Sequence, residues 1–469
     1  MPRRAPGRVV VVGGGVAGLT AAYRLGSGPD AADVTVVEAE GGVGGKLTSV
    51  HVGDLELEAG ADSFVARKPW AVDLCRELGL GGELVAPGAS GAYLWTTRGL
   101  VPYLKDTAFG IPGDVGDVFR WPGLSRAGRA RALQDLVRTT RKDPSDESLG
   151  AMLRRRLGEE ATDRSIAPLL GGLFAGDVDR LSVQATFPEL VAWERSQGSL
   201  IRGAQAARRA AGGAAAPGPM FLKLRGGTAR LTDALADAVG PEHVLTADRT
   251  LRVEPRGRTI VAHGRLGALE ADAVVLATPA TESARLLEPV APPTAAELGA
   301  IPYASTAVVF LVYPEGTADA LPEGTGFVVP RGWAPMTAAT WLSNKWPDPA
   351  FGTRAVIRCY LGGVGYQDVV DEPDEDLVGA CVHHLAALLP LPDRATAAEV
   401  VRWRRAMPQY EVGHLDRVTR IRACLPSGIF VTGSAYGGVG IPDTVRDAND
   451  TATQVRTYLQ VSTRQETLR

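Results

Sequence analysis

Cysteine and histidine are scarce in this chain of 469 residues, and neither type clusters. The four cysteines are Cys75, Cys359, Cys381 and Cys424. They form no Cys-x-x-Cys pair, so we expect neither a disulfide framework nor a metal site, and a reduced cytoplasmic setting fits best. Among the six histidines only His383 and His384 are adjacent, and neighbours on a helix point to different faces. This spacing favours an ordinary packed or surface pair.

The sequence also lacks long apolar runs and an excess of positive charge. No run approaches the roughly 20 apolar residues of a membrane span, so none is expected, while peripheral membrane contact stays open. A basic stretch precedes the apolar run at residue 9, but that run is too short for a signal peptide. The net charge of −3 gives no electrostatic footprint for nucleic acid.

A glycine-rich turn follows the first apolar run. Residues 9–18 read VVVVGGGVAG, in which Gly13, Gly15 and Gly18 form G-x-G-x-x-G, and a second apolar run ends at Glu38. The three glycines permit a tight turn, close approach of the backbone to a pyrophosphate, and close packing of helix on strand. The carboxylate 20 residues after Gly18 can accept hydrogen bonds from a ribose. The pattern predicts a dinucleotide site and leaves NAD and FAD open.

The rest of the chain predicts an α/β fold whose nucleotide-binding domain is discontinuous and Rossmann-like. Residues 115–210 read as mainly helical, and residues 300–400 as β-rich segments with a covering helix. We therefore expect a mixed α+β substrate domain and a helical domain as well. The Gly/Pro/Ala-rich residues 208–219 are predicted to be a flexible loop or linker. The predicted boundaries are 1–66, 221–295 and 405–469 for the nucleotide-binding domain, 67–110 and 296–404 for the substrate domain, and 111–220 for the helical domain.

A second glycine pair, Gly44–Gly45, with Lys46 after it, follows Glu38 at short distance. Here the sequence resembles the superfamily of flavin-containing amine oxidases and protoporphyrinogen oxidases. Four further blocks resemble porphyrinogen oxidases of the soluble type found in Gram-positive bacteria, which act on coproporphyrinogen III. These blocks are ELEAGADSFVARKP, PLLGGLFAGDVDRLSVQATFPEL, MPQYEVGHLDRV and TGSAYGGVGIPD, and the resemblance spans nearly the whole chain in order.

The resemblance implies that the dinucleotide is FAD. Thr250 stands where relatives usually have a valine whose backbone meets the adenine, and Trp403 where a tryptophan lies close to the cofactor or packs in the core. Gly42 replaces an arginine common in the family, and Gly437 a frequent glutamate. The residues implied at the cofactor are Gly13, Gly14, Gly15, Val16, Ala17, Gly18, Glu38, Gly45, Lys46, Gly60, Ala61, Asp62, Ser63, Thr250, Trp403, Val439, Gly440, Ile441 and Pro442.

The resemblance also implies an activity: removal of six electrons from coproporphyrinogen III, with molecular oxygen as acceptor and hydrogen peroxide as product, in haem biosynthesis. The flavin carries the chemistry, so no protein group is assigned as a certain catalyst. Arg67 and Lys68 are expected to bind substrate propionates, unless they are solvated charges at a helix start. Tyr360 is expected to face the active site or pack in the core, and Gly172 to offer a carbonyl to pyrrole N–H groups. Transient contact with a ferrochelatase is a possible partnership.

Three alternatives remain open at this stage. A protoporphyrinogen oxidase is the nearest, although Gly91 and Ala92 provide no charge beside Tyr93, where membrane-attached members carry an arginine. An amine oxidase or carotene desaturase shares the nucleotide motifs but not the FAGDVDRLSVQATFP block. A non-catalytic flavoprotein that binds and carries porphyrin is the third, because Gly42 leaves two outcomes open: either Lys46 or the backbone compensates for the missing arginine, or FAD binds more weakly.

Overall fold

The nucleotide-binding unit is built around a five-stranded parallel sheet with strand order β12-β2-β1-β16-β22. A computed structural model describes residues 7–105, 107–210 and 218–467. The strands are β1 (Arg8–Val12), β2 (Asp33–Val37), β12 (Val244–Leu245), β16 (Ala273–Leu276) and β22 (Ile429–Val431). They come from three separated parts of the chain, which confirms the predicted discontinuous α/β unit. Strand β1 is apolar throughout from Val9 to Val12 because helices cover both faces of the sheet.

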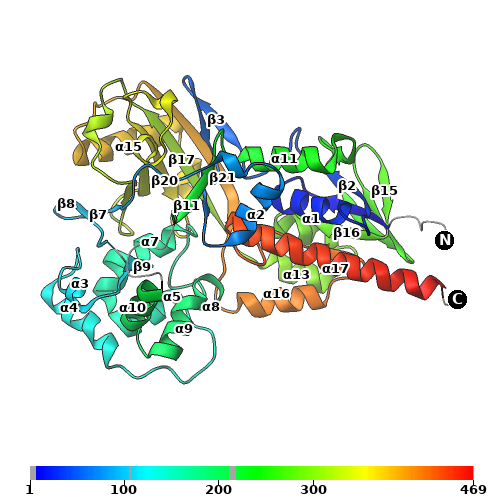
Figure 1. The fold of residues 1–469 in the computed structure, drawn as a ribbon, viewed down its shortest axis with the longest axis horizontal. Coiled ribbons are helices and arrows are strands. Elements are labelled where there is room, and N and C mark those ends of the chain that lie inside the picture. Colours follow the sequence, from blue (N-terminus) through cyan, green and yellow to red (C-terminus); the bar gives the residue numbers. More distant parts are fainter. Residues whose placement is uncertain (1–6, 106, 211–217, 468–469) are drawn as a thin grey trace.

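Helices pack on the two faces of this sheet, on the right of Figure 1. One face carries α1 (Val16–Gly26), α2 (Pro69–Glu77), α11 (Ala229–Val239) and α17 (Ile441–Thr467). The other carries α12 (Ala280–Leu287), α13 (Pro292–Gly299) and α16 (His414–Ala423). A small antiparallel sheet of β13 (Arg252–Arg256), β14 (Thr259–His263) and β15 (Ala268–Ala271) extends this side.

A second, seven-stranded sheet forms the unit at the upper left of Figure 1, with order β21-β17-β20-β19-β18-β7-β8. Its strands are β7 (Tyr93–Thr96), β8 (Gly99–Pro102), β17 (Tyr303–Val312), β18 (Gly326–Val328), β19 (Met336–Trp341), β20 (Val356–Gly362) and β21 (Ala397–Pro408). All pairings are antiparallel except that of β18 with β7. Helix α15 (Asp374–Leu388) covers one face through Leu377, Cys381 and Leu385, as the sequence predicts.

The third unit, at the lower left of Figure 1, is mainly helical. It consists of α3 (Val115–Phe119), α4 (Arg126–Leu133), α5 (Leu149–Leu157), α6 (Glu159–Ala161), a π-helical turn (Thr162–Ile166), α7 (Ala167–Gly172), α8 (Val183–Thr186), α9 (Pro188–Gln197) and α10 (Leu200–Ala210). Arg156 and Asp135 form a fully buried ion pair within it, with Nε and Oδ1 2.5 Å apart. The amide and hydroxyl donors of Ile201 and Ser199 satisfy the second oxygen of Asp135.

Short elements join the three units. They are β3 (Ser49–Val52), β4 (Leu55–Glu58), β5 (Phe64–Val65), β6 (Leu84–Val85), β9 (Thr107–Ala108), β10 (Ile111–Pro112), β11 (Phe221–Leu224) and α14 (Leu342–Lys345), with 3-10 turns at Gly81–Glu83, Gln134–Leu136, Pro241–His243, Ala318–Ala320, Pro349–Phe351 and Gln367–Asp371. Within the described residues, no helix combines the length and apolar character needed to cross a bilayer.

Three predicted boundaries differ from the packing. The division at 404/405 falls inside β21, which pairs with β17 on both sides of an irregularity between Trp403 and Met407. Helix α2 lies within the range predicted for the substrate domain, but it packs on α17 because Ala71, Val72 and Leu74 join the nucleotide-binding core. The β3–β4 hairpin, assigned to the nucleotide-binding domain, packs instead on β17 of the larger sheet. Of the predicted linker, residues 208–210 are the end of α10, and 211–217 lie outside the described residues.

Candidate active site

The turn between β1 and α1 needs two of its three motif glycines for steric reasons. Gly13 has φ +110°, and a Cβ there would lie 2.9 Å from the Ala277 carbonyl oxygen. A Cβ on Gly18 would overlap the carbonyl oxygen of Gly13, so only glycine lets the helix approach the strand. A Cβ on Gly15 would meet nothing within 4 Å, since this residue faces open space. No side chain caps the first turn of α1, which leaves its N–H groups available to an anion.

Glu38, directly after β2, is fixed beside this turn. Its Oε2 accepts from the Gly14 amide at 2.6 Å and its Oε1 from the Glu40 amide at 2.9 Å. A carboxylate has about four lone-pair positions, so acceptor capacity remains for a ligand hydroxyl. The acid is therefore oriented by the motif glycine itself.

The second glycine pair packs directly against the first motif. The Gly44 amide donates to the Gly14 carbonyl at 2.9 Å, and both Gly44 and Gly45 have positive φ. A Cβ on Gly44 would lie 2.7 Å from the Leu47 carbonyl oxygen. Further along, a Cβ on Gly60 would overlap the carbonyl oxygen of Lys46. The two glycine segments and the 59–63 segment thus form one closely packed wall.

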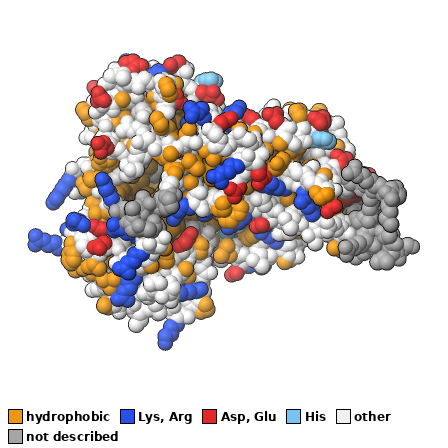
Figure 2. Space-filling model, in the orientation of Figure 1, with side chains coloured by type: hydrophobic (Ala, Val, Ile, Leu, Met, Phe, Trp, Pro, Cys, Tyr) orange, Lys and Arg blue, Asp and Glu red, His pale blue; other side chains and the backbone are white. Residues whose placement is uncertain are grey.

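A cavity of about 2380 Å³ extends from this wall to the place where the sheet unit and the helical unit meet. Single small-molecule sites usually occupy about 300–1,000 Å³, so the space is large enough for a dinucleotide and a second large ligand together. Figure 2 shows the surface hollowed between the two units on the left, with basic side chains around the hollow. Helix α17 begins at the cavity with Ile441, and Gly440 before it also lines the cavity.

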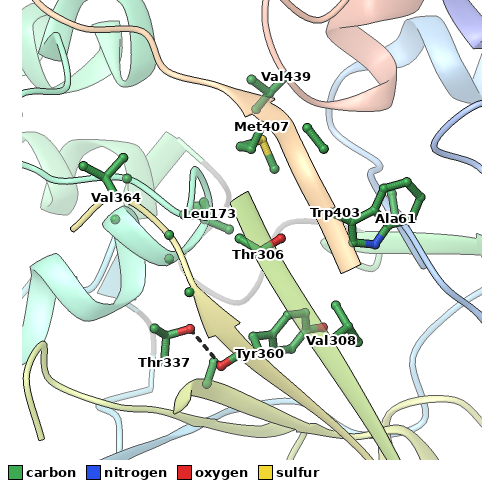
Figure 3. Close-up of a pocket in the computed structure, with 18 of the residues that line it drawn as sticks. Ala61, Leu173, Thr306, Val308, Thr337, Tyr360, Val364, Trp403, Met407 and Val439 are labelled. Atoms are coloured by element: carbon green, nitrogen blue, oxygen red, sulfur yellow. Dashed lines mark hydrogen bonds between the residues drawn. The ribbon is translucent and has the colours of Figure 1, made fainter. Parts of the chain in front are cut away.

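The larger sheet supplies the inner wall of the cavity. Figure 3 shows Thr306 and Val308 of β17, Trp403 of β21 and Tyr360 directed into it, with Leu173 opposite. The Trp403 indole Nε1 donates to the Ala59 carbonyl at 3.0 Å. The Tyr360 hydroxyl is within 3.4 Å of the Thr340 hydroxyl. These side chains form a largely apolar surface beside the 59–63 segment.

Charged groups also hold the 59–63 segment. Arg358, 5% exposed, donates its Nη2 to the carbonyls of Ala59 at 3.2 Å and Gly60 at 2.6 Å. Asp62 Oδ2 accepts from Lys345 Nζ at 2.8 Å and Trp346 Nε1 at 3.0 Å. Burial opposes ionisation of Asp62, but the charges of Lys345 and Arg358 and these hydrogen bonds hold the pKa of its carboxyl far below the usual range. Asp62 therefore stays ionised.

Lys46 is exposed to the cavity rather than to bulk solvent. Its Nζ donates to the Ala406 carbonyl oxygen. Desolvation by the surrounding protein lowers the pKa of its ammonium to about 8. The protonated fraction of this lysine consequently changes with pH just above neutrality.

The cavity as a whole is cationic, although the chain is acidic. Among the described residues that line it there are thirteen lysines and arginines but only seven aspartates and glutamates. The whole chain has a net charge of −3. A concave surface of one sign attracts ligands of the opposite sign, so this cavity fits polyanions.

The profile of the flavin containing amine oxidoreductase family matches residues 16–456. The chain belongs to this family. A coproporphyrinogen III oxidase of Bacillus subtilis is 33% identical over 463 residues, covering 96% of this chain and 98% of its own. One from Mycobacterium tuberculosis is 34% identical, covering 96% and 97%. A crystal structure from Exiguobacterium sp. 255-15, of a protein assigned as a protoporphyrinogen oxidase, superposes with TM-score 0.86 at 31% identity, covering 97% of this chain and 100% of that one.

The nucleotide end of the cavity fits the cofactor that this flavin-dependent oxidoreductase binds, FAD. The uncapped first turn of α1 and the open face of Gly15 suit its diphosphate, and the spare acceptor capacity of Glu38 suits its ribose. Thr250, buried and lining the cavity, has its carbonyl oxygen already bonded to Arg285 Nη2 at 2.8 Å. Within the described ranges, no group of three or more His, Cys, Asp or Glu side chains could hold a metal ion.

The structure brings most of the predicted site residues to the flavoprotein's cavity. Gly14, Gly18 and Pro442 do not line it; Gly14 and Gly18 act through the backbone packing described above. The predicted residues that line it are Gly13, Gly15, Val16, Ala17, Glu38, Gly45, Lys46, Gly60, Ala61, Asp62, Ser63, Gly172, Thr250, Tyr360, Trp403, Val439, Gly440 and Ile441. Their roles toward cofactor and substrate remain proposals.

Arg67 and Lys68, predicted to bind substrate propionates, do not line the cavity either. Helix α2 begins at Pro69 and packs on α17, and this draws the Lys68 ammonium to Asp443 Oδ2 at 2.5 Å. Arg358 and Lys345 are basic residues at the cavity that the sequence reading missed. Arg358 lies two residues before Tyr360 on the same strand and so shares its face, a spacing that identifies it once Tyr360 is placed.

Proposed function

We propose that this flavoprotein oxidises coproporphyrinogen III to coproporphyrin III with molecular oxygen, as a step of haem biosynthesis in the cytoplasm. The observation that carries the proposal is the cationic cavity, which is large enough for FAD and a tetrapyrrole and has six more basic than acidic side chains. Coproporphyrinogen III has four propionates and FAD a doubly charged diphosphate. The names of the relatives from Bacillus and Mycobacterium support the same substrate.

The reaction removes six electrons and six protons from the porphyrinogen, and three oxygen molecules become three hydrogen peroxide molecules. FAD, when bound, supplies the hydride acceptor and the reaction with oxygen. The protein binds the porphyrinogen and orients it beside the cofactor. Arg358 and Trp403 donate to the carbonyls of Ala59 and Gly60, and these bonds hold the segment next to the apolar wall in place.

Two residues of the wall are proposed to position the tetrapyrrole. The Tyr360 phenol stands between Thr340 and the guanidinium of Arg358, 4.9 Å from its ring centre, and can orient a pyrrole or a propionate. Gly172 is exposed at the end of α7, and its carbonyl accepts from the Ala175 amide at 3.2 Å. One lone pair is left for a pyrrole N–H.

Other proposed partners follow from the reaction. Oxygen is the electron acceptor, and a ferrochelatase is a candidate for transient contact, because it consumes the porphyrin product. Peripheral contact with a membrane surface is compatible with the exposed apolar side chains of the helical unit, such as Phe119, which is 59% exposed.

Protoporphyrinogen IX oxidation is the second candidate, favoured by the Exiguobacterium structure at TM-score 0.86. That substrate has two propionates and two vinyl groups, so it uses less of the positive charge in the cavity. The excess of basic over acidic side chains in the cavity favours coproporphyrinogen III, which has four carboxylates.

Parallel assays of the purified holoprotein distinguish the two candidate substrates. Coproporphyrinogen III and protoporphyrinogen IX are supplied at equal concentrations while porphyrin fluorescence and oxygen uptake are recorded. We expect a higher kcat/KM for coproporphyrinogen III and three oxygen molecules consumed per porphyrin. A higher value for protoporphyrinogen IX contradicts the proposal in favour of the second candidate, and turnover of neither contradicts both.

A further inference from the structure

Three segments meet at the solvent end of the cavity. They are residues 173–177 after α7, residues 329–335 between β18 and β19, and residues 362–366 after β20, and all three contribute to the lining. The Val364 amide donates to the Ala175 carbonyl at 2.9 Å, which joins the sheet unit to the helical unit. Figure 3 shows Val364 on the side of the cavity away from Ala61 and Trp403. This place is therefore remote from the glycine segments of the cofactor end.

Arg331 is oriented at this place by its neighbours. Its Nη2 donates to the Val364 carbonyl at 2.6 Å, and its guanidinium lies 5.3 Å from the centre of the Tyr366 ring. A Cβ at Gly365 would lie 2.6 Å from Nη2, so the glycine makes room for the guanidinium. The side chain remains 45% exposed. An oriented, accessible guanidinium suits a carboxylate better than a freely rotating one does.

The carboxylate nearest to Arg331 is held only loosely. Asp177 Oδ1 is 3.5 Å from Arg331 Nη1, beyond the 2.7–3.2 Å of an N–H···O hydrogen bond. Asp177 has its own local partner, the Asp179 amide, which donates to the same oxygen at 3.0 Å. A ligand carboxylate can therefore take the guanidinium without unfolding the 173–177 segment.

Exposed apolar side chains surround this ion pair. Leu173 is 54% exposed, Trp333 44% and Tyr366 40%, and each lines the cavity. Large apolar side chains exposed together at a cavity mouth mark a ligand surface. A tetrapyrrole has an apolar ring edge that carries carboxylates. It therefore matches a surface that combines exposed apolar side chains with a guanidinium.

We propose that Arg331 binds one propionate of the tetrapyrrole at the cavity mouth, that Leu173, Trp333 and Tyr366 pack on the adjoining ring edge, and that the propionate displaces Asp177. The subsite rests on the proposed function, and it replaces the role first assigned to Arg67 and Lys68. Asp177 occupies the guanidinium while the subsite is empty and so competes with the substrate. Removing the arginine must weaken binding, and neutralising the aspartate must strengthen it.

The test measures binding of the product, coproporphyrin III, to the holoprotein by the change in its absorption and fluorescence. Arg331→Gln is expected to raise Kd about tenfold, the effect of one charge-assisted hydrogen bond. Arg331→Lys, which keeps the charge, should recover part of the loss, and Asp177→Asn should lower Kd two- to fivefold. Arg394→Gln is the matched control, because Arg394 is exposed and does not line the cavity. Flavin spectra and thermal unfolding establish that each variant is folded.

Two results overturn the subsite. Either Arg331→Gln binds coproporphyrin III like Arg394→Gln, or Asp177→Asn leaves the wild-type affinity unchanged or weakens it. Asp177→Asn keeps the test decisive if the arginine variants fold poorly. Failure of the proposed function is distinct, since the wild-type protein itself would then neither bind coproporphyrin III nor oxidise coproporphyrinogen III.

Discussion

Raising the pH should release FAD through a single lysine. Lys46 lines the cavity beside the glycine turn, and desolvation lowers the pKa of its ammonium to about 8. The diphosphate of FAD favours the protonated form of a neighbouring lysine. FAD binding therefore raises this pKa, and by linkage the affinity for FAD must be highest below pH 8 and fall above it.

The size of the effect follows from the two pKa values. In the apoprotein the pKa of Lys46 is about 8, and a complex that offsets the desolvation returns it to the ordinary lysine value of 10.5. Between these values binding takes up one proton, so each pH unit weakens binding by up to about tenfold. From pH 7.5 to pH 9.5 the loss reaches about 20-fold if the complex restores the ordinary value.

The assay titrates apoprotein with FAD and follows flavin fluorescence at pH 7.5, 8.5 and 9.5. Lys46→Met should bind FAD more weakly at pH 7.5 and show a flat profile. Lys142→Met is the control, because Lys142 is exposed on the helical unit outside the cavity lining, and it should keep the wild-type slope. A wild-type Kd that changes less than threefold over this range, or a parallel decline in Lys46→Met, refutes the reasoning.

Three further predictions concern single side chains. Gly60→Ala should lower the unfolding temperature and the FAD content, because its Cβ would overlap the Lys46 carbonyl, whereas Gly41→Ala, with open space around it, should change neither. Gly42→Arg meets no steric obstacle and should tighten FAD binding about two- to fivefold at low salt, measured by the same titration; unchanged affinity contradicts this. Burial lowers the pKa of His414 to about 4, so its contribution to stability is complete above pH 6.5 and up to about 3 kcal/mol is lost as the pH falls to 4. His414→Phe, which keeps the stacking on Tyr410, should show less acid destabilisation in denaturant titrations at pH 7 and pH 4.5, and an equal loss in both proteins refutes it.

The nucleotide end could be predicted from the sequence because its requirements are steric and local. Gly13 and Gly18 are read from spacing alone, since a Cβ at either meets a backbone carbonyl. The buried run of β16 could likewise be assigned to the central sheet, because four consecutive apolar residues suit a parallel strand covered on both faces. These features need no knowledge of where distant segments lie.

The substrate end could not be predicted in the same way. Arginine is abundant throughout this chain, so no single arginine stands out by its type. Arg331 lines the cavity only because β18, β19 and β20 bring residues 331 and 364 together, and Lys68 is withdrawn from it only because α2 packs on α17. Both outcomes depend on tertiary packing, and the local sequence gives no sign of either.

Gly437 shows how such packing also explains a departure from the family pattern. A Cβ at Gly437 would lie 2.7 Å from Asp447 Oδ1, on the second turn of α17. Asp447 is buried, accepts from the Thr432 hydroxyl at 2.9 Å and the Gly433 amide at 3.1 Å, and pairs with Arg422. Any residue with a Cβ at 437, a glutamate included, would press on this buried carboxylate, which these partners hold in place. The glycine is therefore required by the acid ten residues later, a dependence that appears only when the start of α17 is placed beside β22.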